Sequence, residues 1–363
     1  MSPVRLRGIT TSGINFGIVI GQLLSNAAIR GFGTRTDKWA YAGPFSIQWF
    51  FVSKLKQFSF PGPQNTDWPV FLGIGLPFAP ESPWYLVRKN RLEDAKNALR
   101  KLYGPNVDIM PKLAAIVRTS EDELELSASA RWIDCFKGTN LKRTAISTGV
   151  FACQHLSGIV FVLGFSTYFF ELAGVATSKA FDLGVGVTAC GVVGVAISWS
   201  AINNFGRRKL FVGGMIALTT VLFLIGIMDV IPTSAAKWVQ ASLTVVYALF
   251  YQITIGCIAF ALLGETPSAA LRAKTLALAT ATQSIFGTVM NFAVPYMVNP
   301  DKANLKGKVG FVFGGLSAAA TLWSFFYIPE LKGRTFEEID EMFEKRVPPR
   351  KMGSYTLGDT YYH

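Results

Sequence analysis

The sequence predicts an all-α integral membrane protein with about eight membrane-spanning helices. Half of its 363 residues are hydrophobic and only 16% are charged, whereas a soluble protein usually carries about a quarter charged residues. The apolar residues gather in runs of about 20, the length that crosses a hydrocarbon core of about 30 Å. A large soluble helical protein is the alternative. We reject it because a soluble fold could not bury so many long and nearly charge-free runs.

Each apolar run predicts one span. In chain order the runs cover residues 9–29, 45–80, 144–170, 181–202, 210–230, 238–263, 275–298 and 309–328. A polar and Pro-rich stretch, Phe51–Asp67, interrupts the second run. We weigh two explanations for it. A short intron translated in frame is one, because Val52 and Ser53 can be encoded by a splice-donor sequence, and a re-entrant loop is the other.

The placement of the charges indicates the orientation of the chain in the membrane. The net charge is +12, and the basic residues crowd the segment 84–143 and the ends of alternate runs. The intervening connections carry few basic residues, apart from the lysines of 299–308. This alternation follows the positive-inside rule and predicts two cytoplasmic termini. We expect a lipid bilayer, the plasma membrane, and no nucleic acid as partner.

The polar segments divide the chain into four predicted parts. Residues 1–83 hold two spans, the second interrupted by 51–67. Residues 84–143 carry apolar side chains at helical spacing and predict a cytoplasmic helical linker. Residues 144–328 hold six spans. Residues 329–363 predict a short charged cytoplasmic helix followed by a disordered tail.

The sequence offers few residues that could carry catalysis or bind a metal. The four cysteines show no ligand spacing, and His155 and His363 are the only two histidines. No nucleophile–base pair is visible either. We therefore expect neither an enzyme nor a bound cofactor or metal, and we take polar residues inside spans as the functional candidates, because burying them in a membrane is costly.

Seven short motifs give the chain a specific resemblance. They are SPVRLRG at 2–8, PESPWYLVRKNRLEDAKNALRKL at 80–102, QHLSG at 154–158, STYFFELAGV at 166–175, NNFGRRKL at 203–210, GETPSAALRAKT at 264–275 and PELKGRTFEEID at 329–340. In this order they resemble the sugar porter family of the major facilitator superfamily, particularly its fungal-type hexose and maltose permeases. Only the region near 51–67 falls outside the resemblance.

The resemblance implies a fold and a function. Family members have twelve transmembrane helices in two six-helix halves, so this chain resembles helices five to twelve and is expected to be truncated at its N-terminus. The implied function is transmembrane carbohydrate transport, as sugar/proton symport of a hexose or α-glucoside by alternating access. A non-transporting, sensor-like protein and an inactive remnant from a gene-model fragment are the alternatives. We expect the 363-residue chain itself not to transport.

The candidate sugar site combines amides, an imidazole and aromatic rings. Amides can bind sugar hydroxyl groups and aromatic faces can cover the sugar ring. The candidates are Asn15, Gln154, His155, Phe165, Phe260, Gln283 and Asn291. The resemblance assigns ligand roles near Asn15, Gln154, His155 and Gln283. Hydrogen bonding between helices and ordinary aromatic packing are the alternatives. Val160 stands where the family often has Asn, which leaves the exact sugar open.

A second set of candidates consists of charged residues that flank the spans on the predicted cytoplasmic face. They are Arg7, Glu81, Arg207, Arg208, Glu265, Arg272, Glu330 and Arg334. The resemblance implies that such residues form salt bridges that close a cytoplasmic gate. Membrane anchoring would explain the arginines but not Glu265 and Glu330. We therefore expect one of these two glutamates within ion-pair distance of Arg207 or Arg208.

Overall fold

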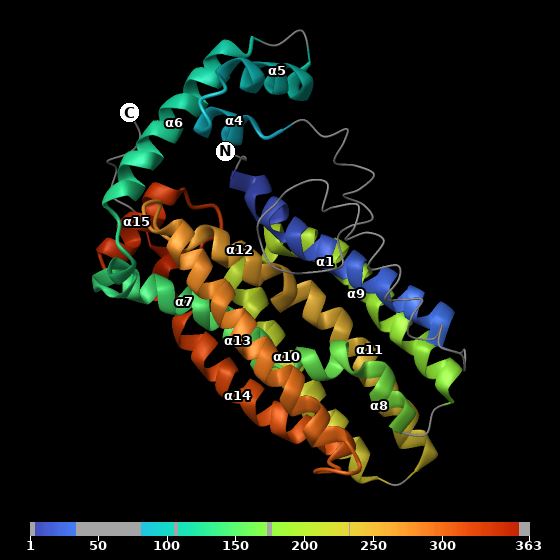
Figure 1. The fold of residues 1–363 in the computed structure, drawn as a ribbon. Helices are drawn as coiled ribbons and strands as arrows, with labels where there is room; N and C mark the ends of the chain where they lie inside the picture. The colour runs from blue at the N-terminus through green and yellow to red at the C-terminus, as the bar shows by residue number, and fades with distance from the viewer. Residues whose placement is uncertain (1–3, 34–80, 105–107, 173–175, 232, 356–363) are drawn as a thin grey trace.

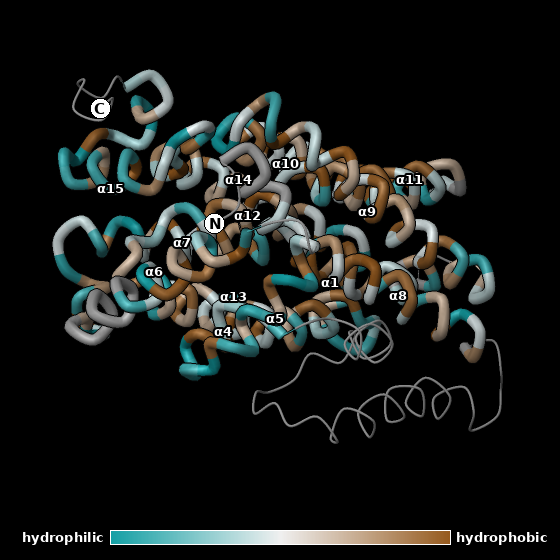
Figure 2. The backbone as a smooth tube through the Cα atoms, turned by 90° about the horizontal axis from the view of Figure 1, so that it is seen from above, coloured by the Kyte–Doolittle hydropathy of each residue, from teal (hydrophilic) through white to brown (hydrophobic). Residues whose placement is uncertain are grey.

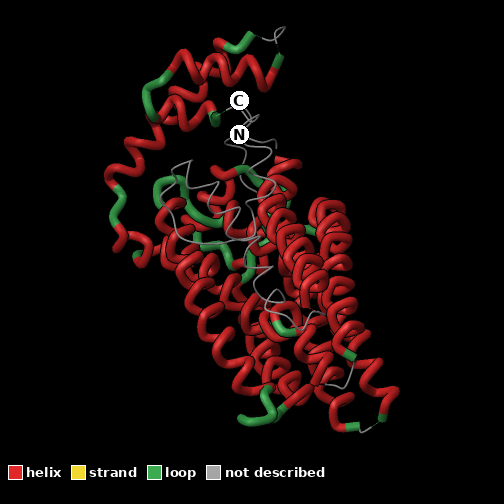
Figure 3. Tube along the Cα trace, turned by 45° about the vertical axis from the view of Figure 1, so that its right-hand side comes forward, coloured by secondary structure: helices red, strands yellow, loops and turns green. Residues whose placement is uncertain are grey.

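The protein, seen in a computed structural model, is a bundle of long helices with a smaller helical unit projecting from one end (Figure 1). The structure describes residues 4–33, 81–104, 108–172, 176–231 and 233–355. Among these residues every regular element is a helix (Figure 3). The predicted all-α class is therefore confirmed. The run 45–80, including Phe51–Asp67, lies outside the described residues, so both explanations of its interruption stay hypotheses.

The other predicted spans coincide with helices of the bundle. Five are continuous, namely α1 (Val4–Gly33), α9 (Thr177–Phe205), α10 (Arg207–Val230), α13 (Arg272–Val298) and α14 (Val309–Tyr327). By length and composition, five segments of the described residues can cross a membrane: Thr10–Phe32, Thr177–Phe205, Arg207–Val230, Ala235–Glu265 and Lys306–Tyr327. α13 is not among them, because threonines, Gln283 and Asn291 lower its hydropathy.

Two spans are interrupted by π-helical turns. α7 (Gly138–Leu156) is followed by the π-helix η3 (Val160–Gly164) and by α8 (Ser166–Leu172). α11 (Ser234–Tyr251) passes through the π-helix η4 (Gln252–Gly256) into α12 (Cys257–Glu265). Single π-helical turns occur frequently at functional sites, because they displace the backbone from the regular hydrogen-bond pattern.

Gly158 explains where α7 ends. Its φ of +82° lies in the left-handed region, where a side chain is strained. A Cβ atom on this residue would also lie only 3.1 Å from Cβ of Phe313 on α14. Glycine satisfies both conditions, and the chain therefore turns between α7 and η3 in direct contact with α14.

The bundle is held by long helix–helix contacts around an apolar core. α1 packs along α9 and α12, α7 packs on α13 and α14, and α10 lies against α11 and α14. Figure 2 shows hydrophobic residues along these helices. Tyr247 is fully buried among them, and its hydroxyl donates to the Ser157 carbonyl at 2.5 Å. The α7 turn is thereby tied to α11.

The projecting unit has a small core of its own. It consists of α4 (Pro83–Arg88), α5 (Leu92–Tyr103) and α6 (Met110–Ser129). Leu86, Ala95, Leu99, Ile109 and Leu113 form its buried centre. This unit occupies most of the predicted linker, and the 3-10 helix η2 (Trp132–Phe136) connects it to α7.

The C-terminal segment folds back onto the bundle end. The 3-10 helix η5 (Lys306–Lys308) precedes α14, and α15 (Phe336–Glu344) and the 3-10 helix η6 (Pro349–Ser354) follow it. Thr335 caps α15 in a capping box with Glu338. α15, the start of α1 and the projecting unit lie at the same end of the bundle (Figure 1). Part of the tail that the sequence predicts to be disordered, Pro349–Ser354, forms η6, and residues 356–363 lie outside the described residues.

Candidate functional site

A buried cluster of amides lies where α1 and α7 meet the η4 turn. Asn15 donates from Nδ2 to Oε1 of Gln252 at 2.8 Å and to Sγ of Cys257 at 3.4 Å. Gln154 donates from Nε2 to the Ile255 carbonyl at 3.4 Å. All three amide side chains are buried. Two of the predicted sugar ligands, Asn15 and Gln154, therefore converge on one π-helical turn.

His155 faces the neighbouring helix α13. Its Cε1 lies 3.4 Å from the position that a Cβ on Gly287 would occupy, and the ring approaches the backbone of Gln283. Neither ring nitrogen makes a hydrogen bond of good geometry within the described ranges, although both are shielded from solvent. Gln283 lies one turn before Gly287, so the predicted ligands His155 and Gln283 border the same space between α7 and α13.

The remaining predicted ligands contribute less to this space. Phe260 is half-buried and packs edge-on against Phe151 at 5.5 Å, an arrangement that aromatic core packing also explains. Phe165 is half-buried directly after η3. Asn291 is exposed, and its amide donates to the Gly287 carbonyl of its own helix at 2.8 Å. The structure does not bring Asn291 to the amide cluster.

Gln252 is a site residue that the sequence reasoning missed. It is the acceptor for Asn15, and it is the first residue of η4. The signal was available, because Gln252 is an amide in the middle of the apolar run 238–263, the same feature that identified Gln154.

The charged set contains one buried ion pair. The guanidinium of Arg207, at the start of α10, donates to Glu265, at the end of α12, through Nη2 at 2.8 Å and Nε at 3.2 Å. The two side chains are only 4% and 3% exposed. Such a bidentate pair is strong and fixes its geometry. The expected contact of Glu265 with Arg207 is present, whereas its role as a gate stays a prediction.

Glu330 binds a helix N-terminus instead of an arginine side chain. Its two carboxylate oxygens accept from the backbone N–H groups of Arg207 at 2.9 Å and Arg208 at 3.1 Å. A carboxylate is favoured there because the first N–H groups of a helix lack partners and carry positive partial charge. The Arg208 guanidinium binds the backbone carbonyls of Phe325 and Ile328.

The other charged candidates are separate from that pair. Arg272 lies over the Phe336 ring at 4.3 Å, and Arg334 pairs with Glu338 on α15 at 3.7 Å. Glu81 is exposed. The side chain of Arg7 is outside the described residues, so its membership of the charged set stays a prediction.

A further ion pair joins α7 to the C-terminal helix. The buried guanidinium of Arg143 pairs with Asp340 and lies over the Phe343 ring at 4.5 Å. Its side chain is 4% exposed, so the charge depends on these contacts. In the sequence Arg143 is one of many basic residues near the start of α7, and nothing singled it out.

These features define a class of protein. A membrane helix bundle with two interrupted helices, polar side chains buried at the interruptions and ion pairs at one end has the construction of a transporter. The model of the family described as sugar (and other) transporter matches residues 1–343. The chain belongs to this sugar porter family of the major facilitator superfamily.

Its similar proteins are permeases of yeast. The chain is 34% identical to the general alpha-glucoside permease of Saccharomyces cerevisiae and 33% identical to the maltose permease MAL31 of the same organism. Both matches cover 97% of this chain and 56% of the relative. The chain thus spans about half the length of the curated relatives it matches. The predicted relation to fungal maltose-type permeases, rather than to enzymes, is confirmed.

Solved structures confirm the fold. The proton:xylose symporter XylE bound to 6-bromo-6-deoxy-D-glucose matches with a TM-score of 0.65 at 21% identity, covering 94% of this chain and 68% of that one. The inward open conformation of XylE from E. coli gives a TM-score of 0.63 at 20% identity, over 94% of this chain and 66% of that one. The predicted major facilitator fold is therefore confirmed.

Proposed function

We propose that this chain serves transmembrane carbohydrate transport, with a hexose or an α-glucoside as substrate. The observation that carries the proposal is the buried amide cluster of Asn15, Gln154 and Gln252 at the η4 turn. These amides offer donors and acceptors without a fixed charge, which suits a polyol. The permease relatives support the same substrate class.

Alternating access is the proposed mechanism. The Arg207–Glu265 pair and the Glu330 contacts hold the ends of α10, α12 and α14 together in this conformation. Opening at this end requires their separation. Ligands that favour one state shift the population toward it, so a sugar bound at the amide cluster would bias whether these contacts are made.

Protons are the proposed coupling ion, and the plasma membrane is the proposed location. The similarity of the fold to XylE, a proton:xylose symporter, supports coupling by analogy. The shared position of α15 and the start of α1 at one bundle end supports two termini on the same side, which the positive-inside rule assigns to the cytoplasm. Uptake that rises with an imposed inward proton gradient would support coupling. Uptake indifferent to that gradient would contradict it.

Equilibrium binding tests the site directly. The purified chain in nanodiscs should bind radiolabelled maltose or glucose saturably, and Gln154→Ala should weaken binding about tenfold or more, because a lost buried hydrogen bond costs about 1–3 kcal/mol. Gln240→Ala is the matched control, because Gln240 is a buried glutamine that binds a backbone carbonyl, Ile225, elsewhere in the bundle. An equal effect of both variants, or no saturable binding, would contradict the site.

Uptake into transporter-null cells is the companion experiment. Saturable uptake of radiolabelled maltose or glucose would support the transport class. Saturable binding without uptake would favour the sensor-like alternative.

A further inference from the structure

The end of α14 carries the exposed aromatic residues Phe325, Phe326 and Tyr327, whose exposed fractions are 45%, 50% and 48%. The Phe325 ring meets the Phe326 ring edge-on, with 5.6 Å between their centroids. The Tyr327 ring stacks on that of Trp323 at 5.3 Å. Tyr and Trp are enriched where a membrane meets water, and Tyr327 is the last residue of the span Lys306–Tyr327. This end of α14 therefore lies at the level of the lipid headgroups.

Two guanidinium groups from distant parts of the chain lie against the same ring. The Arg350 guanidinium, on η6, is 4.2 Å from the centroid of the Phe325 ring and 4.3 Å from that of Phe326. The Arg208 guanidinium, on α10, is 5.6 Å from the Phe325 centroid. Aromatic rings attract cations within about 6 Å of their centroids, so Phe325 holds both charges in one place.

Acidic side chains leave this pair of arginines short of negative charge. Glu330 is the acidic residue whose charge acts on Arg208. Its carboxylate, however, already accepts from the backbone N–H groups of Arg207, Arg208 and Lys332. Arg350 makes no ion pair among the residues that the structure describes. Two like charges held close together repel each other, and an anion between them would remove the repulsion.

The arginine pair is preformed, because both segments that carry it are held in place. The Arg208 guanidinium binds the backbone carbonyls of Phe325, at 2.6 Å, and of Ile328. These bonds anchor it to the end of α14. On η6, the side chain of Met352 is buried against the bundle, whereas Arg350 is exposed and accessible to a ligand.

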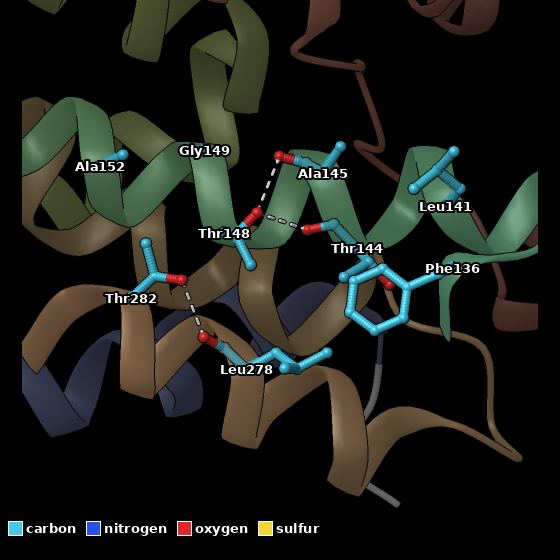
Figure 4. A pocket seen from close by; sticks show the side chains of 9 residues that line it. All are labelled: Phe136, Leu141, Thr144, Ala145, Thr148, Gly149, Ala152, Leu278 and Thr282. Carbon is cyan, nitrogen blue, oxygen red and sulfur yellow. Dashed lines mark hydrogen bonds between the residues drawn. The ribbon is translucent and has the colours of Figure 1, made fainter. Parts of the chain in front are cut away.

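The groove between α7 and α13 is a different kind of surface (Figure 4). Its volume is about 400 Å³, and its lining, as the structure describes it, carries no charged side chain. Thr148 and Thr282, which line it, donate to carbonyls of their own helices at 2.9 Å. The groove adjoins His155 and Gln283 on the same two helices and belongs to the proposed sugar-binding space. An anion is therefore expected at the arginine pair and not in this groove.

The position of the arginine pair favours a lipid as the source of the anion. The pair lies at the end of the bundle that also holds α15 and the start of α1 (Figure 1). The positive-inside rule assigns this end to the cytoplasm, and the cytoplasmic leaflet is rich in anionic lipids. A phospholipid offers the phosphate that guanidinium groups recognise, together with acyl chains that can cover exposed phenylalanine rings. A soluble phosphate offers only the first.

We propose that Arg208 and Arg350 bind the phosphate of an anionic phospholipid in the cytoplasmic leaflet. The phosphate lies between the two guanidinium groups, and the acyl chains lie along α14 past Phe325 and Phe326. Because Arg350 is on η6, the bound lipid ties the C-terminal segment to α10 and to the membrane. This site is separate from the amide cluster, so lipid binding does not depend on whether the chain transports a sugar.

Hydrogen–deuterium exchange of the η6 segment tests the proposal. The full chain is placed in nanodiscs of phosphatidylcholine alone or of phosphatidylcholine with phosphatidylserine, and peptides that cover Pro349–Ser354 are followed by mass spectrometry. We expect phosphatidylserine to slow the exchange of these peptides about fivefold, the usual effect of one basic residue near an anionic surface. Equal exchange in the two membranes would overturn the proposal.

Matched variants separate lipid binding from ordinary packing of η6. In Arg350→Gln the slowing by phosphatidylserine should disappear, whereas Lys209→Gln, which removes an exposed lysine next to Arg208, should keep it. An equal loss in both variants would indicate general attraction to an anionic surface and would contradict a site. If Arg350 only anchors η6 to the rings, Arg350→Gln would speed exchange while exchange in the unmodified chain would not depend on the lipid.

Inorganic phosphate distinguishes the two sources of the anion. Added to the unmodified chain in phosphatidylcholine nanodiscs, it should leave the exchange of Pro349–Ser354 unchanged, because it lacks the acyl chains that contact the phenylalanine rings. Slowing equal to that by phosphatidylserine would overturn the assignment to a lipid.

Discussion

Removing the Glu265 carboxylate should destabilise the bundle by about 3–5 kcal/mol, the usual cost of leaving one member of a buried ion pair without its partner. The magnitude follows from burial and geometry. Arg207 and Glu265 are 4% and 3% exposed, and two hydrogen bonds join them at 2.8 and 3.2 Å. In Glu265→Ala the guanidinium of Arg207 keeps its charge but cannot reach water.

The double variant Arg207→Met/Glu265→Met should be much less affected. It removes both charges and keeps most of the side-chain volume, and replacing a buried ion pair by packed apolar residues is often neutral or stabilising. The backbone N–H of Arg207 keeps its bond to Glu330 in either variant. The difference between the single and the double variant thus isolates the cost of an unpaired charge.

Denaturant unfolding in detergent micelles measures both variants. Asp94→Ala is the control, because the Arg91–Asp94 pair is 61% and 50% exposed, and exposed pairs contribute about 0–1 kcal/mol. A loss below about 1 kcal/mol in Glu265→Ala, or equal losses in the single and double variants, would refute the reasoning.

Three further changes probe other contacts. Gly158→Ala should cost about 1–2 kcal/mol, because φ is +82° there, and Gly213→Ala, with open space around it, should not; thermal unfolding compares them. Asn15→Ala should cost about 1–3 kcal/mol by leaving the buried Gln252 amide short of a partner, and restoration of stability by Asn15→Leu with Gln252→Leu would show that the pairing is responsible. Arg143→Met should release α15 and speed proteolysis of the C-terminal segment, whereas unchanged cleavage would exclude a clamping role.

The spans were predictable because a membrane imposes one strict requirement. A helix that crosses it must be apolar over about 20 residues, and α9, α10 and α14 satisfy this wherever their partners lie. The breaks were not predictable. The turns Val160–Gly164 and Gln252–Gly256 contain no proline. The hydropathy of a sequence also does not show whether its residues form a π-helix or an α-helix. Only packing against neighbouring helices distinguishes the two.

The site was predictable in composition but not in pairing. The cost of burying an amide identifies Asn15 and Gln154 from the sequence alone. It does not identify Gln252 as the partner of Asn15, because the two residues are 237 positions apart and only the packing of α1 on the α11–α12 span brings them together. The contact of Arg207 with Glu265, 58 positions away, was expected only because the family resemblance implies salt bridges among these residues.

Asn291 is a predicted ligand that lies on a different face of α13 from Gln283. It lies eight residues after Gln283, and at about 100° per residue the two side chains differ by about 80° around the helix. That angle separates a half-buried Gln283 from an exposed Asn291. A separation of seven residues would have aligned them far better.

The π-helical turn η4 also changes what its span can present to its surroundings. It holds one residue more than the regular helix accommodates, so the part of the span beyond it is rotated by about 100° relative to an unbroken helix. α12 consequently follows a different phase of the apolar pattern from α11. A one-residue deletion at this turn would rotate half of a spanning helix about its own axis. It would exchange inward-facing for lipid-facing side chains without altering any of them.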